Sequence, residues 1–154
     1  MNYCIDAETF LNIWLKYYPP DIFMGVWKGL ENLVASGELG TVEPVLEELL
    51  EKSPPIHSWV KKRIKMIHPV SYEINEILSE FNKKHSKLIN DLNKTSRSLL
   101  FALAFAKIND LKIISLHEHN SKLLEFCSIE NLELISVSQL SREQAWAFRM
   151  LNFW

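Results

Sequence analysis

Apolar and polar positions follow two different periods along the chain. Short apolar runs predict strands over residues 2–5, 39–42, 66–70, 111–116 and 132–137. Apolar residues that recur three or four positions apart predict helices over residues 8–18, 22–35, 44–52, 56–65, 71–87, 98–108 and 121–126, and from residue 138 onward. Because the strands alternate with helices of this length, the pattern indicates an α/β sandwich built on a mostly parallel sheet.

Several of these helices carry signals at their ends. Pro19 and Pro20 end the first helix, and Asp21 is expected to cap the second. Ser71 is expected to begin a longer helix, whose lysine-rich continuation should be solvated. Residues 98–108 are apolar on nearly every side of the predicted helix. This segment is therefore predicted to be the buried core helix.

The length of the chain predicts one domain over residues 1–154. A chain of 154 residues suits a single core, and no linker, repeat or low-complexity tract divides it. The last predicted helix, residues 138–154, is rich in aromatic side chains towards its end, namely Trp146, Phe148, Phe153 and Trp154. So apolar a segment is expected to pack either on the domain itself or on a partner.

Charge and cysteine usage limit the classes of function. The formal net charge of −2 provides no global field for a polyanion, so RNA binding would need a local basic patch. The candidate lysines are interleaved with Glu73, Glu76 and Glu80, which is more typical of solvated helix faces. These lysines are Lys61, Lys62, Lys65, Lys83, Lys84 and Lys87. Cys4 and Cys127 lie in apolar segments and are expected to be buried thiols, which favours a cytoplasmic protein. No apolar run reaches the roughly 20 residues of a membrane span, so we expect no membrane partner.

Asp6 is the first candidate for chemistry. It follows the apolar run at residues 3–5 and directly precedes a predicted helix. That order places a carboxylate at the carboxyl edge of a parallel sheet, where α/β folds hold ligands and metals. The simpler interpretation is that Asp6 caps the helix. The chain has no glycine-rich phosphate loop, no zinc-type spacing and no nucleophile elbow.

Several segments resemble one known family. They are Tyr-Cys-Ile-Asp-Ala-Glu-Thr-Phe-Leu at 3–11, Trp-Leu-Lys-Tyr-Tyr-Pro-Pro-Asp-Ile-Phe at 14–23, the helix at 27–37, Val-Leu-Glu-Glu-Leu at 45–49 and the helix-strand unit at 101–114. Together they resemble the PIN-like domains, relatives of the bacterial VapC-type toxins of toxin–antitoxin modules. The resemblance covers about residues 1–116. It implies a three-layer α/β/α sandwich and an acidic cluster that binds Mg²⁺ or Mn²⁺ to hydrolyse RNA.

The resemblance assigns four positions to that acidic cluster. Asp6 matches the first acid and Glu48 the second, as metal ligands and catalytic residues. The third acid falls on Leu99, and the fourth falls near His117, with Glu118 as a weaker candidate. Each carboxylate about 5 Å from a divalent ion contributes several kcal/mol even at an effective dielectric near 20. Two missing acids therefore predict a degenerate site that binds Mg²⁺ or Mn²⁺ weakly or not at all.

The matched residues also have simpler interpretations. Without the resemblance, Glu48 would be a solvated residue on an acidic helix face, and His117 and Glu118 would belong to an ordinary polar loop. Leu99 cannot bind a metal and is predicted to extend the core. A further hypothesis is that Arg97 or Lys94 reaches Asp6 and Glu48 and replaces the metal with an ion pair.

Three functions follow as alternatives. The first is a PIN-like domain with a degenerate centre that binds a protein partner, such as a cognate antitoxin, or RNA. The second is an active metal-dependent ribonuclease that uses Asp6, Glu48 and a displaced third ligand such as Glu118, Asp110 or His117. The third is a structural subunit without a role in nucleic-acid chemistry. The resemblance also suggests a homodimer.

Overall fold

The computed structural model describes residues 1–116 and 120–146, and these residues form a five-stranded parallel sheet. The strands are β1 (Tyr3–Ile5), β2 (Leu39–Val42), β3 (Ile67–His68), β4 (Lys112–Ile114) and β5 (Leu134–Ile135). Their order across the sheet is β3-β2-β1-β4-β5, and every neighbouring pair is parallel. This is the strand order of a doubly wound α/β fold.

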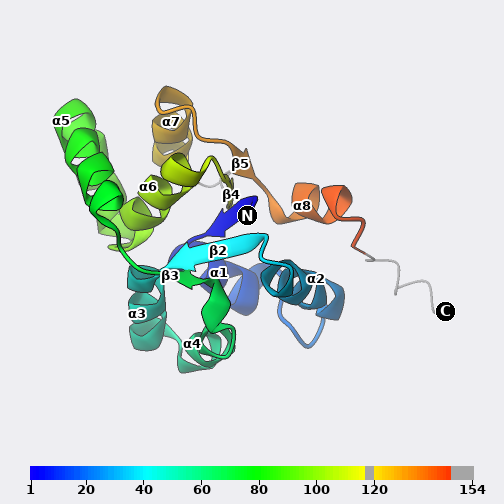
Figure 1. Ribbon diagram of the computed structural model, residues 1–154. Coiled ribbons are helices and arrows are strands. Elements are labelled where there is room, and N and C mark those ends of the chain that lie inside the picture. Colours follow the sequence, from blue (N-terminus) through cyan, green and yellow to red (C-terminus); the bar gives the residue numbers. More distant parts are fainter. Residues whose placement is uncertain (117–119, 147–154) are drawn as a thin grey trace.

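Helices cover both faces of this sheet, which makes the predicted three-layer α/β/α sandwich (Figure 1). One side carries α1 (Ala7–Asn12), the π-helical turn η1 (Ile13–Tyr17), α2 (Met24–Ala35), α3 (Glu43–Lys52) and α4 (Pro54–Lys61). The other carries α5 (Tyr72–Thr95), α6 (Leu99–Asn109) and α7 (Ser121–Ile129). The turn η2 (Ile64–Met66) precedes β3, and α8 (Val137–Glu143) follows β5.

The core fills both faces of the sheet. Buried residues such as Leu103 of α6 cover one face, and buried residues such as Phe10 of α1 and Leu30 of α2 cover the other. In the central strands, Cys4, Ile5, Ile113 and Ile114 are fully buried, as parallel strands covered by helices on both faces require. Leu99 is buried at the start of α6, so its predicted role as core is confirmed. Cys4 and Cys127 are buried free thiols, as the sequence predicted.

The predicted boundary of α2 is wrong. Asp21 does not cap this helix, which begins at Met24 with Phe23 in the capping position. The amides of Ile22 and Phe23 both donate to the Pro19 carbonyl and form a turn instead, which leaves Ile22 69% exposed. The helix predicted over 56–65 also runs differently, since it begins at Pro54, as proline at a first helical turn permits, and ends at Lys61.

Other predictions are confirmed with shifted ends. Ser71 caps α5, because its hydroxyl accepts a hydrogen bond from the amide of Ile74 at 3.2 Å. The strand predicted over 66–70 shrinks to β3, and the final helix begins one residue early, at Val137. The part of that helix predicted over 147–154 lies outside the described residues. Among the described helices, none has the length and apolar character that would let it cross a membrane.

Candidate functional site

A pocket opens at the carboxyl edge of the sheet, where β1 and β4 lie side by side. Connections from β1 run towards β2 and those from β4 run towards β5, so this is the point where the winding reverses. Ligands of doubly wound folds bind at such a point. The pocket encloses about 270 Å³. Most of its lining residues have polar side chains, and the lining comprises Asp6, Glu8, Thr9, Asn12, Lys16, Tyr17, Thr95, Leu99, Ser115, Leu116, Asn120 and Leu123.

Asp6 lies on the inner wall of this pocket. It occupies the N-cap position of α1 with extended backbone angles, yet its side chain makes no capping hydrogen bond. The carboxylate is 4% exposed and accepts a hydrogen bond from the hydroxyl of Thr9. Burial raises the pKa of Asp6 to about 6. The cap interpretation therefore explains the backbone but not the carboxylate, which faces the pocket.

The π-helical turn η1 shapes the pocket's outer wall. The amide of Tyr18 donates to the carbonyl of Ile13 at 2.8 Å, five residues back, so α1 widens as it ends. This turn carries Lys16 and Tyr17 to the pocket. Such π turns recur at functional sites, and the spacing of apolar residues over 8–18 does not distinguish this one from an ordinary α-helix.

Glu48 lies close behind Asp6, at the junction of α3 and α6. It shares the inner face of α3 with Val45 and Leu49, three residues before it and one after, and is 1% exposed. The expectation of a solvated glutamate is therefore wrong, because α3 packs that face against β2 and α6. The charge of Glu48 contributes to the raised pKa of Asp6, so the two carboxylates are electrostatically coupled.

The carboxylate of Glu48 already accepts from three donors. Ser96 Oγ donates to it at 2.8 and 2.9 Å, the amide of Ser98 donates at 3.0 Å, and Lys52 Nζ lies 2.9 Å away. Burial raises the pKa of Glu48, but these donors outweigh burial and hold the pKa below its ordinary value of 4.5. Glu48 is therefore an ionised carboxylate with a resident cation.

Lys52 connects Glu48 to the rim of the pocket. Its ammonium group also lies 4.0 Å from the carboxylate of Glu8, which lines the pocket. The side chain of Lys52 is 41% exposed, so one end of this ion-pair cluster meets solvent while Glu48 is enclosed. We call Glu48, Lys52, Ser96 and Ser98 the Glu48 cluster.

The hypothesis that Arg97 or Lys94 neutralises Asp6 and Glu48 is wrong. The guanidinium of Arg97 instead forms two hydrogen bonds with Glu51, at 2.7 and 2.8 Å, on the surface. Lys94 is exposed on α5. A different lysine forms an ion pair with Glu48. Lys52 lies four residues after Glu48 on the same helix, and its ammonium group contacts the Glu48 carboxylate.

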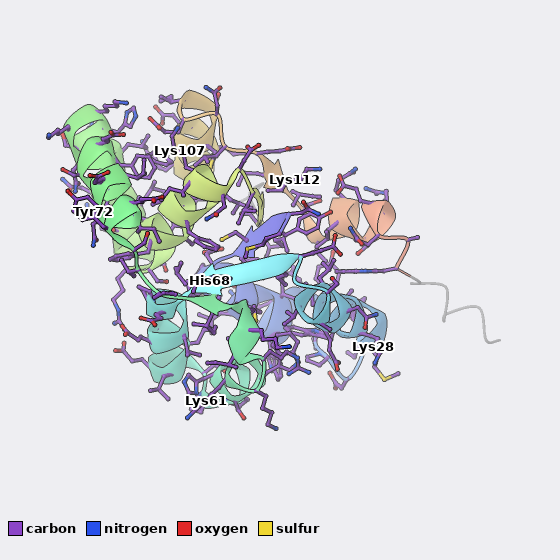
Figure 2. The ribbon with its side chains drawn as sticks, viewed as in Figure 1. Lys28, Lys61, His68, Tyr72, Lys107 and Lys112 are labelled. Carbon is purple, nitrogen blue, oxygen red and sulfur yellow. The ribbon has the colours of Figure 1, made fainter. Side chains whose placement is uncertain are left out.

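Asp110 is wrong as a third ligand. It precedes β4, whereas Asp6 follows β1, and the two strands are parallel, so these residues lie at opposite edges of the sheet. Asp110 instead lines a cavity of about 630 Å³ at the amino edge, beside Lys107 and Lys112, which Figure 2 labels. Both of those lysines are held in ion pairs. His117 and Glu118 lie outside the described residues.

The described residues do not fit a PIN-type metal centre. Over residues 1–116 and 120–146, no group of three or more His, Cys, Asp or Glu side chains is placed to hold a metal. Of the two matched acids, Glu48 is bound by Lys52, and Leu99 brings a hydrocarbon to the third position. A divalent ion at Glu48 would have to displace an ammonium group and compete with two serines.

Sequence reasoning missed Lys52, Ser96 and Ser98. The signal for Lys52 was present, since Glu48 and Lys52 have the i, i+4 spacing that favours ion pairs on a helix. The signal for burial of Glu48 was its spacing from Val45 and Leu49. Nothing local marks Ser96 and Ser98 as its donors, because they reach Glu48 only through the packing of α3 on α6.

The fold and the pocket define a doubly wound α/β domain with an acidic pocket at its switch point. The chain belongs to the family Domain of unknown function (DUF4411), whose model matches residues 3–148. Comparisons with curated proteins and with solved structures gave no match.

Proposed function

We propose that this chain is a PIN-like domain, related to the VapC-type toxins, whose acidic centre holds a lysine instead of a metal and which acts by binding a protein partner. The observation that carries this proposal is the Glu48 cluster. A carboxylate that is 1% exposed and bound by an ammonium group and two serines is a structural element. A hard cation such as Mg²⁺ would have to compete with these three donors for the carboxylate oxygens.

The position of the pocket supports the proposed ancestry. Asp6 lies at the carboxyl end of the central strand, and Glu48 approaches it from α3, as the PIN-like resemblance requires of its first two acids. Leu99 lines the same pocket from the start of α6. The positions that would converge on a metal are therefore close together, but their chemistry has changed.

A protein partner fits the surface around the pocket better than RNA does. Tyr17 lines the pocket and is 44% exposed, and Leu15, on the same turn η1, is 60% exposed. Exposed apolar side chains of this kind are typical of protein interfaces. The lysines considered for RNA binding do not line this pocket. They lie at the end of α4 and just after it (Lys61, Lys62), on η2 (Lys65) and on α5 (Lys83, Lys84, Lys87).

A metal-dependent ribonuclease is the second candidate. It is favoured by the coupling of Asp6 and Glu48 at one edge of the sheet and by the pocket in front of Asp6. The described residues alone do not form the ligand set that such a reaction requires. In a ribonuclease, His117 or Glu118 would therefore have to complete the site.

One assay separates the two candidates. RNA cleavage in the presence of Mn²⁺ is measured for the wild type and for Asp6→Ala and Glu48→Ala, with Arg97→Ala as a surface control. We expect no cleavage above background from any of the four proteins. Cleavage by the wild type and Arg97→Ala that is lost in both acid variants would establish the ribonuclease and overturn our proposal.

A further inference from the structure

Two buried polar side chains in the pocket at the carboxyl edge of the sheet have unused hydrogen-bonding capacity. Asp6 is 4% exposed, and Ser115, which directly follows β4, is 3% exposed. Among the described residues, Thr9 alone donates a side-chain hydrogen bond to the Asp6 carboxylate. The amide of Ser115 donates to the carbonyl of Ile135 at 2.9 Å, whereas its hydroxyl has no hydrogen-bond partner within residues 1–116 and 120–146. Because buried polar groups normally have partners, these two side chains point to a ligand.

Asp6 has no cation beside it among the described residues. It forms no ion pair there, and Lys52 contacts Glu48 and Glu8 instead. Burial raises the pKa of Asp6 to about 6, which still leaves most of this carboxylate ionised at pH 7.5. Asp6 and Glu8 bring two negative charges to the pocket lining and Lys16 brings one positive charge, so the formal charge of these lining residues is −1. The described lining therefore suits a ligand with one positive charge.

Leucines supply an apolar wall to the same pocket. Leu99 lies at the start of α6, Leu116 follows β4, and Leu123 lies on α7. Leu99 and Leu123 are 2% and 5% exposed, so they belong both to the core and to the pocket lining. A hydrated metal ion gains nothing from hydrocarbon of this kind, because apolar surface contributes when it meets other apolar surface and releases water. A ligand that carries a short hydrocarbon chain next to its charge uses both parts of the lining.

The volume of the pocket limits the ligand to a small molecule. It encloses about 270 Å³, just below the roughly 300–1,000 Å³ of typical ligand pockets. At about 30 Å³ for each molecule of liquid water, this space corresponds to on the order of nine waters. A chain of about five carbon atoms with one charged end fits this volume.

We propose that this pocket binds a small primary alkylamine in its ammonium form. The ammonium group pairs with Asp6 and donates to the hydroxyl of Ser115, and the hydrocarbon chain lies against Leu99, Leu116 and Leu123. An ammonium group has three N–H donors and no acceptor, so it serves both oxygens at once. A neutral alcohol would leave the charge of Asp6 unpaired, and a metal ion would leave the leucines unused. The inference goes beyond the proposed function and does not rest on it, because no protein partner and no residue of the Glu48 cluster takes part.

Titration of the full-length, ¹⁵N-labelled protein with n-butylammonium chloride at pH 7.5 tests the proposal. Two-dimensional ¹H–¹⁵N NMR spectra report which amides respond, and they detect the weak binding that is typical of so small a ligand. We expect saturable shifts at the amides of Thr9, Ser115 and Leu123, and no saturable shifts there with 1-butanol, the neutral molecule of nearly the same shape. Affinity should rise by about fourfold for each methylene group from methylammonium to butylammonium, because each group adds hydrocarbon against the leucines.

Three variants assign the contacts of the bound amine. Asp6→Asn keeps the shape of the side chain and removes its charge, so it should weaken butylammonium binding by at least about tenfold. Ser115→Ala removes one acceptor and should weaken binding by about two- to fivefold. Glu133→Gln is the control, since it removes a negative charge from a side chain that is 68% exposed at the amino edge of the sheet, and it should leave the affinity unchanged within about twofold. The same spectra show that each variant is folded.

Three results would overturn the proposal. The first is the absence of saturable shifts in the wild type up to about 20 mM butylammonium. The second is equal affinity of the wild type and Asp6→Asn, or an equal loss of affinity in Asp6→Asn and Glu133→Gln, since either would show that Asp6 is not the counter-ion. The third is binding of 1-butanol as tight as that of butylammonium, which would show that the pocket does not select a positive charge.

Discussion

Removal of the Lys52 ammonium group should destabilise the protein through Glu48. In Lys52→Ala the carboxylate of Glu48 stays 1% exposed but loses the cation 2.9 Å away, and keeps only the donors from Ser96 and Ser98. Two unit charges at that distance attract by about 6 kcal/mol at an effective dielectric near 20. Because Lys52 is 41% exposed, solvent screening removes more than half of this. We expect a loss of about 1–3 kcal/mol, which is roughly 3–8 °C in Tm.

Differential scanning calorimetry at pH 7 on a small set of variants measures this effect and its cause. Lys65→Ala is the matched control, since it removes an exposed lysine on η2 and should leave the Tm unchanged. The double variant Lys52→Ala/Glu48→Gln should recover part of the loss, because a neutral amide costs less to bury without a cation. A Tm for Lys52→Ala equal to that of the control, or a double variant less stable than Lys52→Ala alone, would refute the reasoning.

Three further predictions concern single sites. Asp6→Asn should stabilise the protein at pH 8 by up to about 3 kcal/mol, since the pKa of Asp6 rises from 3.8 to about 6 on folding. The free-energy penalty of burying the charged Asp6 is present above pH 6 and disappears as the pH falls towards 4. Urea titrations should therefore give the wild type and Asp6→Asn the same free energy of unfolding near pH 4. Gly29→Ala should lower the free energy of unfolding by about 1–2 kcal/mol, measured by thermal unfolding. The added methyl group would collide with the Trp146 ring and expel it, which outweighs a helix-propensity gain of about 1 kcal/mol. In a Trp146→Ala background the same substitution should instead be stabilising. Arg97→Ala should leave the Tm unchanged within calorimetric error, because its pair with Glu51 lies at the surface, and a clear drop would contradict this.

The sheet and most helices could be predicted because their signals are local. The short segments Tyr3–Ile5 and 113–114 are apolar on both faces, as a parallel strand covered by helices on both sides requires. The start of α2 could not be predicted. The amides of Ile22 and Phe23 bind the Pro19 carbonyl in a turn, so the helix begins at Met24 and Asp21 does not cap it. The edge strands β3 and β5 are only two residues each, where the sequence indicated five and six, because the sheet pairs each of them on one side only.

Of the candidate site, the sequence alone could place Asp6 and could indicate that its acidic cluster is incomplete. Asp6 follows from strand order alone, whereas burial of Glu48 depends on α3 packing on α6, which involves residues about 50 positions apart. The sequence suggested Arg97 as the cation that binds Glu48, because Arg97 is next to the start of α6. In the structure the side chain of Arg97 binds Glu51 instead, and Lys52, one turn along α3, binds Glu48. Ion-pair partners depend on such side-chain directions, which spacing alone does not decide.

Direct measurement of Mn²⁺ binding tests the central claim that a lysine occupies the acidic centre. Electron paramagnetic resonance of free Mn²⁺ is recorded during titration with the wild type and with Glu48→Gln at pH 7. We predict that the wild type binds no more Mn²⁺ than Glu48→Gln does, up to about 1 mM metal, because Lys52 already neutralises Glu48. A stoichiometric Mn²⁺ site in the wild type that disappears in Glu48→Gln would contradict the account.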